Sequence, residues 1–474
     1  MSHSKNTTII EEIGVFFQKS TNNAMQRILD VLNGIKMNDR VLGLHTECNA
    51  RRNTSDKVVL LTLFPFFGVK NPNGYPSSSL AGIVSSGKDQ FYRLLNADTV
   101  DWRKLNYKVF NALRRKIKAN GGSEAPTCLI VDDTDLPKRG FHIESIGKVY
   151  SHATRTFSLG FKMLAPAFDD GKQLLNTDFS IHGEKGKNGN YGLTDKQLGN
   201  RKRVSHDLNG ADTERVMEYD MSKIDVLINM IRRFVRRGHK ADYLLADSWF
   251  TCAELVRFVH RPRCGMHYLG MAKIGNTKYG VNGKEVTAKQ MLKRKYKRSR
   301  NRRLHCQYFT VLADFQGVAV RLFFCRKNDC KDWRVILTTD CGLNSEEAYR
   351  LYARRWDIEV FFKECKQNLN LGGCQSHRFN AQIAATTISM IQYNLLATAK
   401  RFDSYETFGE LFRAAGVAVT EQTVTQRIWM AISTLIEEIA EFLNVDTDPL
   451  LENYLFDNEN FTKFINLKTL MPAG

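Results

Sequence analysis

The chain lacks any apolar run long enough to cross a membrane. Its longest apolar run, residues 58–69 (VVLLTLFPFFGV), has 12 residues and contains a proline, whereas a spanning helix needs about 20 apolar residues. The first residues, MSHSKNTTIIEE, show no basic segment followed by an apolar one, so no signal peptide is expected. These two absences predict a cytoplasmic protein that does not bind membranes.

Paired cysteines and zinc-type spacings are also missing. The 10 cysteines form no Cys-x-x-Cys pair, and none of the 11 histidines stands in a His-Glu-x-x-His or Cys/His zinc pattern. A disulfide framework and a zinc site are therefore not expected. The thiols are expected to be reduced, as they are in a cytosol.

Acidic residues are too few to balance the basic ones. In 474 residues there are 50 Asp and Glu against 69 Lys and Arg, which gives a net charge of +19. The hydrophobic content of 43% is ordinary for a globular protein with a real core, and the length suggests about three domains. The positive surplus favours a polyanionic partner, nucleic acid before membrane. Residues 431–474 carry −6, so the first 430 carry +25, and this tail is expected to avoid DNA.

The first part of the chain, residues 1–122, is predicted to be a helical DNA-binding domain. Apolar residues recur at helical spacing, and small turns separate the runs, as in helix-turn-helix proteins. We expect Lys88, Gln90 and Arg93 on the outer face of a helix over 88–96, with Lys88 and Arg93 facing DNA. A plain helical bundle with solvated charges is the alternative. The other predicted helices cover residues 8–32 and 55–66.

The middle of the chain, residues 123–400, has the alternation of an α/β domain. Apolar runs at 128–131 and 243–246 read as buried strands, and each ends at an aspartate: Asp132 or Asp133 after the first, Asp247 after the second. Sites in α/β sheets lie beyond the carboxyl ends of the strands. Two such aspartates in a basic α/β domain suggest a site for hard divalent cations.

Other predicted elements of this domain carry no candidate site residue of the triad. Residues 159–168 read as a strand, 212–237 as one long helix, and about 265–340 as a strand-rich insertion. The remaining residues, 401–474, are predicted to form a helical C-terminal region.

A basic run interrupts the strand-rich insertion. Eight of the eleven residues 293–303 (KRKYKRSRNRR) are Lys or Arg. Such runs usually form solvated loops, but in a basic chain beside an α/β core a loop that contacts phosphates is favoured. The predicted DNA-contacting residues are Lys293, Arg294, Lys295, Lys297, Arg298, Arg300, Arg302 and Arg303.

Residues 346–371 are predicted to form one helix with a polar strip beside its apolar stripe. At 100° per residue, four polar residues share a strip about 60° wide: Tyr352, Arg355, Glu359 and Lys366. The adjoining stripe is formed by Leu351, Ile358, Phe362, Cys365 and Leu369. A helix surface held by i,i+4 ion pairs is the structural alternative, but it gives Tyr352 and Lys366 no role.

The spacing Tyr-x2-Arg-x3-Glu-x6-Lys of this strip resembles the signature of the insertion-sequence-4 family of DDE transposases. The segments IVDDTDLPKRG (130–140), LGFKMLAPAF (159–168) and LLADSWF (244–250) are similar to the family's aspartate regions. The resemblance covers about residues 55–400. It implies an RNase H-like catalytic core with a strand-rich insertion, and a transposase that cuts and joins DNA at the ends of an insertion sequence.

The resemblance also implies site residues and partners. The catalytic and metal-binding triad would be Asp132, Asp247 and Glu359, with Asp133 as the alternative to Asp132. Two Mg²⁺ ions, replaceable by Mn²⁺, would bind there, and Tyr352, Arg355 and Lys366 would hold phosphates near the element's end.

Expected partners are double-stranded DNA, both element ends and target, and a second copy of the chain in a synaptic complex. The protein would then be cytoplasmic and associated with the nucleoid. The alternative function is a non-catalytic DNA-binding protein derived from a transposase, an inhibitor or a domesticated regulator.

Overall fold

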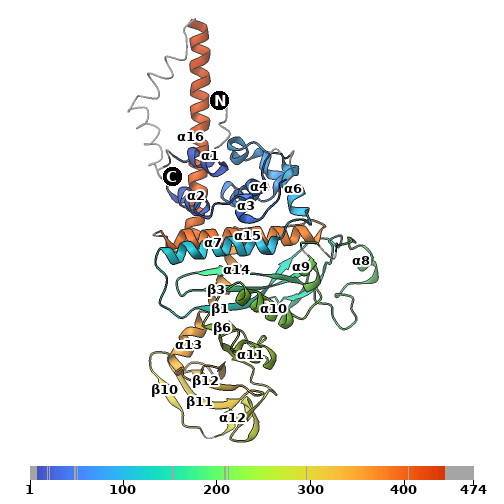
Figure 1. Cartoon of the computed structure of the whole chain (residues 1–474), viewed down its shortest axis with the longest axis vertical. Coiled ribbons are helices and arrows are strands. Elements are labelled where there is room, and N and C mark those ends of the chain that lie inside the picture. Colours follow the sequence, from blue (N-terminus) through green and yellow to red (C-terminus); the bar gives the residue numbers. More distant parts are fainter. Residues whose placement is uncertain are drawn as a thin grey trace. The chain divides into compact units, whose positions relative to one another are not determined.

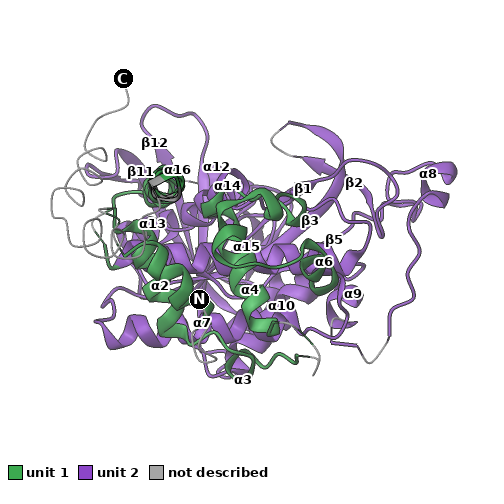
Figure 2. Cartoon of the chain, turned by 90° about the horizontal axis from the view of Figure 1, so that it is seen from above, with its two compact units in different colours: residues 1–94, 402–474 green, residues 95–401 purple. Residues whose placement is uncertain are grey.

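The structure is a computed structural model that describes residues 8–443 except 19, 21, 47–49, 51, 152, 153, 208, 209, 212, 295 and 404. Contacts divide the chain into two compact units, residues 1–94 with 402–474 and residues 95–401, shown in Figure 2. We call them unit 1 and unit 2. The division differs from the expected boundaries, because the helix at 102–119 belongs to unit 2 and the described C-terminal helix belongs to unit 1.

Unit 1 is helical in its described residues, as predicted. The expected helix over 8–32 is two helices, the first of which is capped by reciprocal hydrogen bonds between Thr8 and Glu11. Its helices are α1 (Ile9–Phe16), α2 (Ala24–Ile35), α3 (Asp39–Leu42), α4 (Thr54–Leu63), η1 (Phe64–Phe67), η2 (Pro72–Ser77), α5 (Ser79–Ile83), most of α6 (Lys88–Asn96) and α16 (Phe408–Leu443).

The first part of α16 packs on the other described helices of unit 1. Leu411, Ala415, Ala418 and Val419 are buried, and the helix contacts α2 and η1. Beyond this part, Figure 1 shows α16 continuing past the other helices of unit 1. The tail whose charge we expected to avoid DNA lies outside the described residues from 444 onward.

Unit 2 is built on one large mixed sheet, in agreement with the predicted α/β class. Its main path runs β2-β3-β1-β6-β7-β13-β12-β11-β8-β9. The core strands are β1 (Cys128–Pro137), β2 (Gly147–Ser151), β3 (Thr156–Asp169), β4 (Leu174–Asn176), β5 (Ser180–His182), β6 (Tyr243–Ala246) and β7 (His267–Ala272). Strands β6 and β7 run parallel to β1, and β3 runs antiparallel to it.

The strand-rich segment at about 265–340 continues this sheet. Strand β13 pairs with β7, and β12 and β11 follow, so the segment extends the core sheet edge to edge. Its elements are β8 (Lys278–Val281), β9 (Lys284–Thr287), α12 (Ala288–Lys293), β10 (Ser299–Asn301), β11 (Cys306–Asp314), β12 (Ala319–Lys327) and β13 (Arg334–Thr338).

The helices of unit 2 cover the sheet. Helices α7 and α15 contact each other, α10 contacts β3, and α14 contacts β1 (Figure 1). Their bounds are α7 (Trp102–Ala119), α8 (Asp195–Gly199), α9 (Thr213–Glu218), α10 (Lys223–Arg236), α11 (Ala253–His260), α13 (Ser345–Ala353), α14 (Trp356–Asn368) and α15 (Phe379–Arg401).

Two predicted long helices are interrupted. Residues 212–237 form α9 and α10 with a break at 219–222, and residues 346–371 form α13 and α14 with a break at Arg354 and Arg355. At the second break the backbone N–H groups of both arginines bond to carbonyls three residues back, at Leu351 and Tyr352. The tighter turn follows from tertiary contacts of the two arginine side chains, which are described below.

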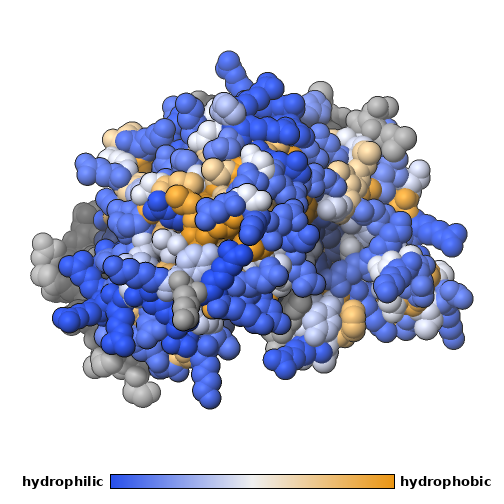
Figure 3. Space-filling view, turned by 90° about the horizontal axis from the view of Figure 1, so that it is seen from below, coloured by the Kyte–Doolittle hydropathy of each residue, from blue (hydrophilic) through white to orange (hydrophobic). Residues whose placement is uncertain are grey.

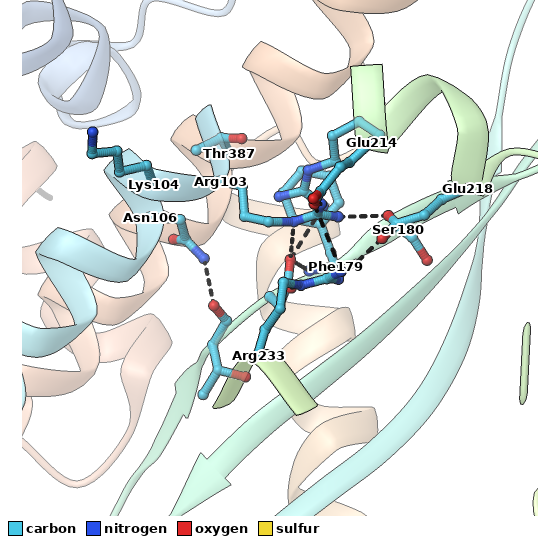
Figure 4. A network of polar contacts seen from close by, with 12 residues as sticks. Arg103, Lys104, Asn106, Phe179, Ser180, Glu214, Glu218, Arg233 and Thr387 are labelled. Carbon is cyan, nitrogen blue, oxygen red and sulfur yellow. Dashed lines mark hydrogen bonds and ion pairs between the residues drawn. The ribbon is translucent and has the colours of Figure 1, made fainter. Parts of the chain in front are cut away.

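The break between α9 and α10 lies beside a buried network of charges (Figure 4). Asp178 accepts from Arg103 at 3.2 Å and pairs with Arg233 at 3.0 Å, and both arginines also pair with Glu218. Burial alone raises the pKa of Asp178, but Arg103, Arg233 and Arg215 outweigh it and hold that pKa well below its usual range. The network joins α7, α9 and α10 to the segment after β4.

None of the helices in the described residues combines the length and the apolar character that crossing a bilayer requires. The face in Figure 3 is largely hydrophilic, with a hydrophobic area near its middle.

Candidate active site

The two aspartates of the doublet point to opposite faces of β1. Asp132 Oδ2 accepts from Arg355 Nη1 at 2.9 Å, whereas Asp133 Oδ2 accepts from Lys223 Nζ at 2.5 Å. This alternation is inherent in a strand, whose successive side chains leave opposite sides of the sheet. Asp132 therefore faces α14, and Asp133 faces the start of α10.

Asp247 lies at the carboxyl end of the neighbouring parallel strand. Val131 of β1 is in register with Ala246 of β6, so Asp132 and Asp247 each stand one residue beyond this pair. The prediction that the first strand ends at the aspartate doublet was wrong, because β1 continues to Pro137 through its antiparallel pairing with β3. Asp247 Oδ1 accepts from the backbone N–H of Trp249 at 2.8 Å and of Phe250 at 3.3 Å, which closes the turn after β6. The structure thus brings two of the predicted triad to one sheet edge.

Glu359 reaches the same edge through Arg355. The Arg355 guanidinium donates to Asp132 at 2.9 Å and to Glu359 Oε1 at 2.5 Å. The adjacent Arg354 donates to Asp169 Oδ2 at 2.6 Å and to the carbonyl of Pro126 at 2.6 Å, which ties the helix break to β3. The apolar stripe of α14 anchors the other side, because Ile358, Phe362, Cys365 and Leu369 are buried as predicted.

Burial is the main influence on the pKa of Asp132. Burial raises its pKa to about 7; its own hydrogen bond from Asp133 N–H and the charge of Arg355 oppose this, and Asp247 adds to it. The pKa of the Tyr352 phenol rises to about 12, again mainly by burial, with contributions from Asp247 and Asp132. The Arg355 guanidinium lies 6.0 Å from the Tyr352 ring centre.

Lys366 contacts the same face of β1 two residues further on. Its Nζ donates to Thr134 Oγ1 at 2.7 Å, and Thr134 is on the Asp132 side of the strand. The four residues of the predicted strip thus all lie at this end of β1, although the helix that carries them is broken. Sequence spacing identified the strip. The helix break changes the backbone at Arg354 and Arg355, but the four side chains stay on the same side.

The carboxylates of Asp132, Asp247 and Glu359 are ligands of the kind that hard divalent cations bind, but their side chains are not grouped into a coordination site. Carboxylate oxygens are the ligands that Mg²⁺ prefers, and Asp132 and Asp247 offer two of them, one on β1 and one directly after the neighbouring β6. In the part of the chain that the structure describes, no three His, Cys, Asp or Glu side chains are grouped to hold a metal ion. Arg355 provides the positive charge between Asp132 and Glu359 instead.

The basic run is the end of α12, a short connection and strand β10, not one loop as expected. Its residues are exposed on the strand-rich segment, with Lys295 outside the described residues. Arg298 lies over the Trp333 ring at 5.4 Å, and Arg303 lies 3.5 Å from Glu346. The exposed basic residues of the run are Lys293, Arg294, Lys297, Arg298, Arg300, Arg302 and Arg303.

In unit 1, α6 presents two of the three expected polar side chains to solvent. Lys88 and Arg93 are exposed, and Lys88 Nζ donates to Asn73 Oδ1 at 3.1 Å. The placement of Gln90 was wrong, because it is half-buried and its side-chain oxygen is buried. At 100° per residue Gln90 is rotated toward the buried Phe91 and Leu94.

A cavity of about 540 Å³ opens beside the site. One wall comes from the α13–α14 region, with Tyr349, Tyr352 and Trp356, and the other from β12 and the residues that follow it, with Lys327 and Arg334. Trp356 is 61% exposed, so it lines open space beside Arg355.

Sequence reasoning missed two residues next to the site, Lys223 and Trp249. The Lys223 ammonium lies 4.2 Å from the centre of the Trp249 ring. The segment ADSWF was recognised only for its aspartate, and nothing in the local sequence around Lys223 connects it with β1, because that contact spans 90 residues.

Two family models match this part of the chain. Residues 216–395 match the transposase DDE domain, and residues 78–273 match the DDE superfamily endonuclease. These matches support a DDE transposase. The first range contains Asp247 and Glu359, and the second contains Asp132 and Asp247.

Among solved structures, the chain is similar to a cryo-EM structure of the piggyBac transposase synaptic complex with hairpin DNA. The identity is 12% and the TM-score is 0.43, with 98% of this chain and 85% of that chain covered. No curated protein matches the chain.

Proposed function

We propose that this chain is a transposase of the insertion-sequence-4 family, with an RNase H-like core, that binds the ends of an insertion sequence and cleaves and joins DNA strands. The observation that supports this most is the meeting of three elements at one sheet edge. Asp132 lies within β1 and Asp247 directly follows the neighbouring parallel strand β6, and Arg355 links Asp132 to Glu359 of α14. The two DDE-type family matches cover the same residues.

In this proposal Asp132, Asp247 and Glu359 would hold two Mg²⁺ ions, whose chemistry there would be to activate a water and to stabilise charge on the leaving 3′ oxygen. Mn²⁺ would serve as a substitute. Asp133 faces away from α14 and is the less suited member of the doublet.

The other residues of the strip orient the DNA. Arg355 is already a bidentate donor to two carboxylates, and the same planar fork fits the oxygens of a scissile phosphate. Tyr352 stays protonated at neutral pH, because its pKa is about 12, so its hydroxyl can donate to phosphate. Lys366, held beside β1 by Thr134, adds a second cation. Their common task is to hold the reacting groups in line.

The proposed partners follow from charge and exposure. Double-stranded DNA, from both the element ends and the target, would contact the basic run and, in unit 1, Lys88 and Arg93. A second copy of the chain would complete the synaptic complex, and the protein would be cytoplasmic and associated with the nucleoid.

Cleavage of an end-containing duplex by purified variants tests the function. Glu359→Gln and Asp132→Asn keep side-chain size but remove a ligand charge, so cleavage should fall by orders of magnitude while end binding persists. Asp133→Asn should retain measurable cleavage. Near-normal cleavage by folded Glu359→Gln protein would contradict the assignment of Glu359 as a catalytic metal ligand. A wild-type chain that binds the ends but never cuts them, with Mg²⁺ or Mn²⁺, would instead be a non-catalytic regulator.

A further inference from the structure

Behind the candidate site, one lysine touches both strands that carry the aspartates. Lys223, the first residue of α10, donates from Nζ to Asp133 Oδ2 at 2.5 Å. The same ammonium lies 4.2 Å from the centre of the Trp249 ring. Asp133 belongs to β1 and Trp249 to the turn after β6, so a single cation links the middle of one strand to the turn that follows its parallel neighbour.

The turn that Lys223 reaches is the one that holds Asp247. The backbone N–H groups of Trp249 and Phe250 donate to Asp247 Oδ1 at 2.8 and 3.3 Å, so the position of this turn affects the orientation of the carboxylate. The far side of the turn is anchored independently. Phe250 is buried, and Thr251 Oγ1 donates to the carbonyl of Met271 on β7 at 2.6 Å. Trp249 itself is 43% exposed, and its ring contacts both the Lys223 ammonium and, edge to face, the Phe250 ring, whose centroid lies 4.9 Å away.

A surface ion pair does not account for this arrangement. The side chains of Lys223 and Asp133 are each only 19% exposed, so solvent screens their charges incompletely. The neighbouring Lys162 has its own partner, Asp135 at 2.5 Å, and lies 4.0 Å from Asp133. Lys223 is therefore the nearer cation of Asp133, and an ammonium over the face of a tryptophan gains a further attraction.

We propose that Lys223 is a positioning residue that clamps Asp133 to Trp249 and thereby sets the spacing and orientation of Asp132 and Asp247. In this arrangement the two residues of the doublet have separate tasks. Asp132 faces α14 and the reaction, and Asp133 acts from the other face through Lys223. The inference rests on the proposed function, since it concerns how that site is held for its metal ions.

Binding of Mn²⁺ to the full-length chain, measured by calorimetry without DNA, tests the clamp with a readout other than activity. Residues that support metal ligands typically change metal affinity by about 10- to 100-fold when removed. Lys223→Met keeps the aliphatic stem and loses the charge, so Mn²⁺ affinity should fall within that range. Lys223→Arg retains a cation for both partners and should restore most of it. Lys278→Met, which removes the lysine of the exposed Lys278–Glu285 pair, is the matched control and should bind Mn²⁺ like the wild type.

The double variant decides whether Asp133 works through Lys223. If it does, Asp133→Asn weakens Mn²⁺ binding as Lys223→Met does, and the combined variant is no weaker than either alone. Abolished binding in Asp133→Asn beside unchanged binding in Lys223→Met would make Asp133 itself the ligand and overturn the clamp. Unchanged binding in both variants, with binding lost in Asp132→Asn, would overturn the clamp and leave the proposed function intact. A wild type that neither binds Mn²⁺ nor cleaves DNA would contradict both the clamp and the proposed function.

Discussion

Arg355 is the residue around which the candidate site is arranged. It donates to one carboxylate on a strand and to another on a helix, and it lies close to the Tyr352 ring. An ion pair between Arg355 and Glu359 alone would be the i,i+4 pairing of a helix surface. The contact with Asp132, 223 residues away in the chain, shows that the strip faces the sheet edge. This contact with the sheet supports the proposal that the strip belongs to a site and is not only a salt-bridged surface.

Lys366 and Lys363 separate these two interpretations by experiment. If Lys366 holds a terminal phosphate, Lys366→Ala should reduce cleavage of element ends and change the unfolding free energy by only about 0–1 kcal/mol, the range of exposed ion pairs. Lys363 stands one turn from Glu359 but outside the Tyr-Arg-Glu-Lys spacing, so Lys363→Ala is the internal control. Cleavage assays and thermal unfolding of both variants provide the measurement. A larger effect of Lys363→Ala, seen in melting temperature and not in cleavage, would support the salt-bridge alternative.

At the scale of elements, the basic run is held against the sheet by aromatic stacking. The ring of Tyr296 stacks on Phe309 with centroids 5.1 Å apart, and Phe309 stacks on Phe324 at 4.5 Å. Strand β10 also pairs with β11. These contacts order part of a segment that the sequence alone marks as a solvated loop. An ordered row of cations suits a DNA backbone, because less freedom is lost on binding.

Replacing Lys297, Arg300 and Arg302 by Gln should weaken binding to all DNA sequences alike. Each lost phosphate contact should also reduce the slope of binding against salt by about one unit, since fewer counterions are released. Binding isotherms at several salt concentrations measure this. The matched control is Lys284→Gln with Lys289→Gln, two exposed lysines of the same strand-rich segment outside the run. An unchanged salt slope in the triple variant would mean that the run is only solvated.

At the scale of the whole molecule, α16 carries an apolar face that the described part of unit 1 does not cover. At 100° per residue its exposed large apolar residues fall within a strip about 60° wide. Their separations are mostly seven and four, which is the spacing of a coiled-coil seam. The same strip on a second copy would be its natural partner, in agreement with the proposed dimer. The residues are Val417, Val424, Ile428, Leu435, Ile439 and Phe442.

Light scattering of the full-length chain tests this dimer. The wild type should have twice the chain mass of 54.3 kDa, and Ile428→Glu with Leu435→Glu should reduce it to one chain, because charge is buried at the seam. Val15→Glu changes an exposed apolar residue elsewhere in unit 1 and should leave the dimer intact. A wild type that remains a monomer at all concentrations, with and without end DNA, would contradict the dimer.

Local patterns in the sequence determined several of the strands and helices around the candidate site. The presence of strands at 128–131 and 243–246 and the buried stripe of α14 follow from hydrophobic periodicity, which depends only on near neighbours. Periodicity did not indicate that the first strand continues through Asp132 and Asp133 to Pro137. The strip of Tyr352, Arg355, Glu359 and Lys366 was visible for the same reason. The class of the middle domain, α/β, also follows from the order of its runs.

Tertiary structure decided what near neighbours cannot specify. Strand alternation implies that the two residues of the doublet face opposite ways, but only the packing of α14 and α10 assigns Asp132 to one helix and Asp133 to the other. At the helix break at 354–355, Arg354 bonds to Asp169 on β3, a contact across 185 residues that the local sequence does not specify. Lys223, Trp249 and the division into two units likewise depend on pairs that are distant in sequence. Such contacts leave no periodic trace along the chain, because they arise only when separate elements pack against one another.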